Sequence, residues 1–97
     1  MTTAVDGKSF SNISATTAGF YLKGGYYVAA CVATFSAGSV DLQALGPDGS
    51  TWLALPVPAH FTVAAIIAPG YLPPGQYRFL VTTATAVFCN VTGVPIS

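Results

Sequence analysis

The run YYVAACVATF, from Tyr26 to Phe35, decides the fold class. Its residues are aromatic, β-branched or small, a composition that favours an extended strand over a helix. The run HFTVAAII, residues 60–67, has the same character, and both runs are apolar at odd and even positions alike. Because a strand with one solvated face alternates apolar and polar residues, we expect a loop or another subunit to cover the outer faces of these two strands.

Turn signals divide the rest of the chain into short segments. Gly24 and Gly25 predict a hairpin because both tolerate positive φ. GPDGST (residues 46–51) predicts a tight turn from its glycines, its proline and an aspartate that can cap its own backbone. Just before it, VDLQAL (residues 40–45) alternates apolar and polar residues, which predicts a half-buried strand with Asp41 and Gln43 on a wet face.

Together these signals predict about seven or eight short strands with a turn roughly every ten residues. We therefore expect an all-β fold, an antiparallel β-sandwich of jelly-roll or Greek-key type. Residues 1–17 are rich in Ser and Thr and predict an extended N-terminal arm or an edge strand. Residues 18–97 are expected to form a single β-sandwich domain.

The chain is unusually poor in charge. Charged residues make up 6% of its 97 residues, against roughly 25% in ordinary globular proteins. They are Asp6, Lys8, Lys23, Asp41, Asp48 and Arg78. A free monomer normally uses surface charge to stay unassociated, so we expect other protein to cover much of this surface, in a homo-oligomer or a larger assembly. The alternative is a secreted domain coated with Thr and Ser.

Several partners and compartments are not expected. The net charge is zero and the basic residues are scattered, which argues against nucleic acid. Prolines interrupt the longest uncharged stretch, so no run approaches the roughly 20 apolar residues of a membrane span. The N-terminal residues do not resemble a signal peptide, and we expect folding in the cytoplasm.

Catalytic, metal and cofactor sites are not expected either. His60 is the only histidine, the acids are three aspartates, and no GxSxG motif presents a serine, so we predict that the chain is not an enzyme. The residue set offers no metal site and implies no cofactor. Cys31 and Cys89 lie in apolar runs and are expected to be buried free thiols, with a disulfide open to them if their strands are neighbours.

The large apolar residues of the chain are the candidates for an interface. The residues that we predict to contribute are Phe10, Ile13, Tyr26, Tyr27, Phe35, Trp52, Phe61 and Ile66. Aromatic residues can also stack on sugars, so a carbohydrate-binding β-sandwich is an alternative, with Trp52 as its first candidate.

Two further stretches carry a resemblance to a known class of proteins. They are SVDLQALGPDGSTWLALPVP (residues 39–58) and LPPGQYRFLVTTATAVFCNVTGVP (residues 72–95). Their turns and strand ends resemble those of small β-sandwich virion proteins of tailed bacteriophages, most closely the capsid decoration, or cement, proteins. The pattern is one of turns and carries no catalytic signature.

The resemblance implies a structural role on the virion. It implies symmetric assembly, most simply a homotrimer, on the outer surface of a capsid assembled in the host cytoplasm. The partner would be the major capsid protein, and the bound protein would clamp neighbouring capsid subunits. A tail or fibre-associated position is the alternative within the same class.

Overall fold

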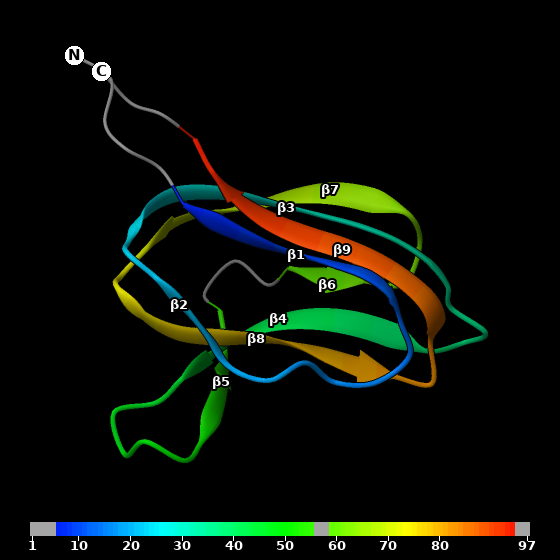
Figure 1. The fold of residues 1–97 in the computed structure, drawn as a ribbon, viewed down its shortest axis with the longest axis horizontal. Coiled ribbons are helices and arrows are strands. Elements are labelled where there is room, and N and C mark those ends of the chain that lie inside the picture. The colour runs from blue at the N-terminus through cyan, green and yellow to red at the C-terminus, as the bar shows by residue number, and fades with distance from the viewer. Residues whose placement is uncertain (1–5, 56–58, 95–97) are drawn as a thin grey trace.

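The computed structural model describes residues 6–55 and 59–94, which form two antiparallel sheets packed as a sandwich (Figure 1). Sheet A has the order β1-β9-β3-β7, and sheet B has the order β2-β8-β4-β5 with β6 also paired to β4. The strands are β1 (Gly7–Ile13), β2 (Phe20–Leu22), β3 (Gly25–Thr34), β4 (Ser39–Leu45), β5 (Trp52–Ala54), β6 (His60–Phe61), β7 (Ala65–Leu72), β8 (Gly75–Thr82) and β9 (Thr85–Gly93). The all-β sandwich predicted from the sequence is confirmed.

The connectivity is that of a jelly roll. The chain passes from one sheet to the other after β1, β2, β3, β6, β7 and β8. The order β1-β9-β3-β7 therefore faces the order β2-β8-β4-β6, the double Greek key of eight strands. Strand β5 is an addition to the connection between β4 and β6, and its hairpin projects beyond the sandwich (Figure 1).

Strand β3 shows how the opening run of sequence forms the core. Tyr27, Ala29 and Cys31 point between the sheets and are almost fully buried, while Val32 points outward. This alternation follows from the two-residue repeat of an extended chain. Strands β9 and β7 pair with β3 on its two sides, so most of its backbone donors and acceptors are paired within sheet A.

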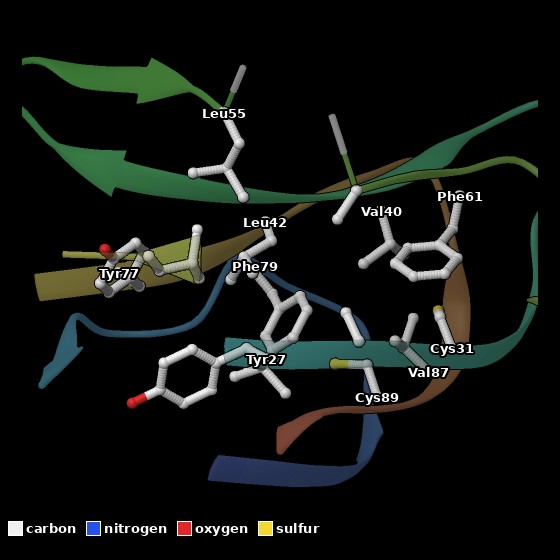
Figure 2. Packing of buried hydrophobic residues seen from close by; sticks show 14 of the residues in the cluster. Tyr27, Cys31, Val40, Leu42, Leu55, Phe61, Tyr77, Phe79, Val87 and Cys89 are labelled. Atoms are coloured by element: carbon white, nitrogen blue, oxygen red, sulfur yellow. The ribbon is translucent and has the colours of Figure 1, made fainter. Parts of the chain in front are cut away.

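The core lies between the inner faces of the two sheets (Figure 2). Its largest side chains are aromatic and come from both sheets: Tyr27, Phe61, Tyr77 and Phe79. At the β1 side, Phe10 closes the core with an edge-to-face contact to Phe79, at 6.0 Å between ring centroids. Each buried aromatic ring removes a large apolar area from water, so these rings contribute strongly to the stability of the domain.

Two turn regions differ from the sequence prediction. HFTVAAII is two strands and not one, because β6 pairs with β4 in sheet B while β7 pairs with β3 in sheet A. Residues 62–64 carry the chain between the sheets. Gly24 and Gly25 do adopt positive φ, at 96° and 132°, but they join strands of different sheets and form no hairpin.

The turn GPDGST is a hairpin loop as predicted, joining β4 to β5. The Asp48 carboxylate accepts hydrogen bonds from the Ser50 and Thr51 amides at 3.1 and 2.9 Å. A further bond from the Thr51 hydroxyl helps to lower the pKa of Asp48 to about 2. The aspartate thus holds the loop by capping its own backbone.

Both edge strands of sheet A contain an irregularity. In β1, Phe10 and Ile13 are three residues apart, but their partners in β9 are only two residues apart. Asn12 lies in this interval and has a positive φ of 53°. In β7, Ile67 and Gly70 are three residues apart, but their partners in β3 are only two residues apart, and Pro69 lies in this interval. Proline is tolerated there because an edge strand pairs on one side only. Each edge therefore carries one extra residue, the mark of a β-bulge.

Hydrogen bonds to Asp6 join the start of β1 to the segment between β2 and β3 and to the start of β3. The Asp6 carboxylate accepts hydrogen bonds from the Tyr27 hydroxyl at 2.5 Å and from the Lys23 amide at 2.8 Å. The Tyr27 hydroxyl in turn accepts a bond from the Gly24 amide at 3.1 Å. Burial and the bond to Asp6 raise the pKa of Tyr27 to about 12, because both favour the neutral phenol.

We predict that Tyr27→Phe lowers the free energy of unfolding by about 1.5–3 kcal/mol, the range for a hydrogen bond to a charged group. The raised pKa adds a pH dependence. The folded state holds the phenol proton more tightly than the unfolded state, so this stabilisation is complete below about pH 10 and is lost as the pH rises towards 12. Urea unfolding of the original protein and of Tyr27→Phe across this pH range should show that the free energy of unfolding falls less steeply with rising pH in the variant. The control is Tyr26→Phe. If both variants lost the same free energy of unfolding, the stability would not come from the hydrogen bond between Tyr27 and Asp6.

Candidate interaction surface

The two outer faces of the sandwich differ in polarity. On sheet B, the Asp41 carboxylate of β4 and the His60 Nδ1 of β6 are hydrogen-bond partners. The Arg78 Nε donates a hydrogen bond to Gln43 Oε1 at 2.9 Å, and its guanidinium lies 4.7 Å from the centre of the Trp52 ring. The wet face predicted for Asp41 and Gln43 is therefore the solvated side of sheet B.

The outer face of sheet A has large exposed apolar side chains on β9, β3 and β7, whereas Asn90 and Thr92 of β9 and Ser9 of β1 make its β1 side polar. Its exposed large side chains are Val32 (59% exposed), Ile66 (73%), Tyr71 (74%) and Phe88 (49%). We call these four residues, with Tyr26 and Ala30, the apolar face. None of the six charged residues belongs to it.

The register brings the residues of the apolar face together across three strands. Val32 lies directly opposite Phe88 of β9, and Ala30 lies opposite Ile66 of β7. Tyr26 lies opposite Tyr71, and their rings meet edge to face at 5.2 Å. Directly opposed residues are within contact distance across a sheet, so these side chains form three cross-strand contacts on the same side of β9, β3 and β7, with Val28 between Tyr26 and Ala30.

A shallow hollow of about 280 Å³ adjoins the apolar face on the β1 side. Ala30, Val32, Phe88 and Asn90 line it from the central strands, and Ser9 contributes from β1. Small side chains at Ala30 and Ser9 leave this space between bulkier neighbours. The surface thus offers a depression beside exposed rings, a shape that can accept a projecting apolar side chain of a partner.

The predicted interface residues do not form one surface. Tyr26 and Ile66 belong to the apolar face. Phe10, Ile13 and Phe35 are half-buried and pack against the core, whereas Tyr27 and Phe61 are each 1% exposed and are core residues. Trp52 lies on the other side of the molecule, beneath Arg78.

Sequence reasoning missed Val32, Tyr71 and Phe88 as contributors to the apolar face. The alternation of β3 already placed Val32 on the same side as Tyr26. Phe88 lies between Val87 and Cys89, two apolar residues that are buried, so alternation along β9 places Phe88 on the outer face. The sequence pattern was therefore sufficient to place Val32 and Phe88 on the outer face. The candidates were the largest apolar residues, however, and several of these are aromatic residues of the core.

No metal site is found among the described residues. Across residues 6–55 and 59–94, no group of three or more His, Cys, Asp or Glu side chains is placed to hold a metal ion. No helix in these ranges is long and apolar enough to cross a membrane. Comparison with known proteins gives no matching family, and no significant match to a curated protein or to a solved structure.

The contact between Arg78 and Trp52 gives a prediction for the sheet B face. Arg78→Ala should shift Trp52 fluorescence to longer wavelength and destabilise the protein by about 1 kcal/mol, because one face of the ring loses its cation. Trp52 is the only tryptophan, so the emission reports on this site alone. Arg78→Lys keeps the charge but loses the planar stack and should give an intermediate shift. An unchanged emission wavelength in Arg78→Ala would show that Arg78 does not cover the Trp52 ring.

Proposed function

We propose that this chain is a structural virion protein that decorates the outside of a tailed-bacteriophage capsid. It would attach through the apolar face of sheet A to the major capsid protein and stabilise contacts between capsid subunits. The observation that carries this proposal is the contrast between the apolar face of sheet A, which has no charged residue, and the outer face of sheet B, which carries Asp41 and Arg78. The resemblance of residues 39–58 and 72–95 to phage decoration proteins supports the same role.

The chemistry of the apolar face suits a permanent protein contact. Burying apolar area gains roughly 25 cal/mol per Å², and a surface without ions loses no ion hydration when a partner covers it. A flat area over three strands gives a modest interface for each copy. Many copies on one shell would then stabilise it through multivalency, and a homotrimer would join three such contacts in one unit.

A carbohydrate-binding role is the second candidate. Tyr71 is 74% exposed and Tyr26 lies edge-on beside it, so the pair presents an aromatic ring to solvent on an uncharged surface. Sugar rings stack on such aromatic rings through the apolar faces formed by their C–H groups. This site differs from the one that the sequence suggested, because Trp52 is already in contact with Arg78.

The first test of the proposal is a charge placed on the apolar face. Ile66→Asp should weaken attachment at least about tenfold, since an unpaired carboxylate would be desolvated on binding. Its effect on folding should be small because Ile66 is exposed. The measurement is cosedimentation with phage heads stripped of decoration protein, beside circular dichroism of the free variant.

Tyr21→Asp is the matched control, because Tyr21 is 64% exposed on β2, which belongs to sheet B. It should bind as the original protein does. Loss of binding in Tyr21→Asp with retention in Ile66→Asp would place the contact on sheet B. Cosedimentation with tails and not with heads would favour the tail alternative, and a Tyr71-dependent response to a glycan panel would favour sugar binding.

The second test is the effect of salt. Because the apolar face has no charged residue, attachment should be nearly unchanged between about 0.1 M and 1 M sodium chloride, where surface ion pairs are largely screened. Sedimentation of decorated heads through gradients at both concentrations measures this directly. Release of the protein at the higher concentration would mean that ion pairs hold it and that the apolar face is not the contact.

A further inference from the structure

Cys31 and Cys89 occupy directly opposed positions on the two central strands of sheet A. The register of β3 against β9 pairs them one to one. Both are reduced, both lie in the core, and their side chains are 1% and 4% exposed. Figure 2 shows the two residues on adjacent strands at one end of the core. The function proposed above makes no use of this pair.

The hydrogen-bonding pattern shows which kind of cross-strand pair they form. The Val94 amide donates to the Tyr26 carbonyl at 2.9 Å, so position 26 of β3 is hydrogen-bonded to its partner on the β9 side. In an antiparallel ladder, bonded and non-bonded pairs alternate. The register runs without a shift from Tyr27 to Val32, so the even positions of β3 are bonded to β9 and Cys31 is in a non-bonded pair.

The opposite side of β9 gives the same result. The Gly93 amide donates to the Asp6 carbonyl at 2.7 Å, so the odd positions of β9 bond to β1. The register of β1 and β9 is unshifted from Gly7 to Phe10, and Cys89 lies opposite Phe10. The backbone of Cys89 therefore bonds towards β1 and not towards Cys31.

A non-bonded pair is the closest approach that two facing residues make in an antiparallel sheet. Its Cα atoms are about 4.5 Å apart, at the lower end of the 4.4–6.8 Å range over which disulfides close. Facing Cβ atoms lie about 4.5–5.5 Å apart, slightly beyond the usual 3.5–4.5 Å of a disulfide. The sulfur atoms point in different directions in Figure 2, so the bond can form by rotation of the two side chains together with a small movement of the strands, and it would carry some strain.

We propose that Cys31 and Cys89 are a dithiol site that a low-molecular-weight disulfide oxidises to a cross-strand disulfide between β3 and β9. One thiol loses its proton, and its thiolate attacks the small disulfide, forming a mixed disulfide and releasing one small thiolate. The second cysteine thiolate attacks the cysteine sulfur of the mixed disulfide and releases the other small thiolate. Two cysteine thiols are oxidised, one small disulfide is reduced to two thiols, and the two protons pass to the released thiolates.

Burial controls the rate of this reaction. It raises the pKa of Cys31, and together with the charge of Cys31 it raises the pKa of Cys89 to about 12. Few thiolates are therefore present at neutral pH, and the sandwich must open locally before a small disulfide can reach them. Oxidation of the folded protein should be slow and should accelerate under conditions that loosen the edge strand β1.

The bridge would join residues 58 positions apart (89 − 31 = 58). Closing a loop of this length restricts the unfolded chain strongly. Even after some loss to strain, the disulfide should raise the melting temperature by at least about 5 °C. Its strain should also make it easier to reduce than an ordinary structural disulfide.

The experiment is to equilibrate the purified full chain in a series of oxidised and reduced glutathione ratios at mildly alkaline pH. After acid quenching and denaturation, the remaining thiols are alkylated and the intact mass is measured. The expected product is a monomer that has lost two hydrogen atoms, takes up no alkylating agent and yields a linked peptide pair containing Cys31 and Cys89. Its melting temperature should be raised, and dithiothreitol should reverse the shift.

Two variants test whether register is the cause. Cys31→Ala should show no rise in melting temperature at any glutathione ratio. The double variant Cys89→Ala with Val91→Cys keeps two inward-facing thiols but moves one to a diagonal position. Diagonal Cα atoms lie about 7–8 Å apart, at or beyond the limit for a bridge, so this variant should remain reduced or form glutathione adducts.

The outcomes separate clearly. Glutathione adducts on the original protein, disulfide-linked dimers, or two alkylatable thiols at the most oxidising ratio would each overturn the proposal. So would an equally fast bridge in the diagonal variant, because pairing would then reflect an open chain and not the register of β3 and β9.

Discussion

The antiparallel pairing of β3 with β9 is the interaction on which the rest of this structure depends. The inward side chains of the pair build one wall of the core with Tyr27, Cys31 and Val91. The outward side chains form the centre of the apolar face, where Val32 meets Phe88. Because side chains alternate in an extended chain, one register fixes both surfaces at once, and a shift by one residue would exchange them.

The distribution of charge follows from the same arrangement. The sandwich has two outer faces, and these differ in the charged side chains that they carry. Sheet B carries Asp41 and Arg78, each with a polar partner, while Asp6 binds at a corner of the fold and Asp48 caps a turn. Strands β9, β3 and β7 of sheet A therefore carry no charge, which makes the two outer faces of the molecule different in any assembly.

Local sequence signals were sufficient for the fold class but not for the connections. The alternation in VDLQAL and the caps of GPDGST depend on near neighbours and were predicted correctly. HFTVAAII was predicted as one strand because its composition is uniform, whereas the division into β6 and β7 depends on which distant strand each half pairs with. Tyr26 and Tyr27 are chemically alike and adjacent, yet one is outside and one is inside. Only the pairing of β3 with the other strands decides between them.

The bulges of β1 and β7 bear on how this protein can associate. A regular edge strand is a template for another chain, and charged residues usually block such growth. This molecule has few charges to use, but both edges of sheet A are interrupted, by Asn12 with its left-handed backbone and by the segment around Pro69. Sheet A is therefore poorly suited to extend sideways into a fibril. The interrupted edges of sheet A thus reduce the risk that its exposed apolar side chains would otherwise bring.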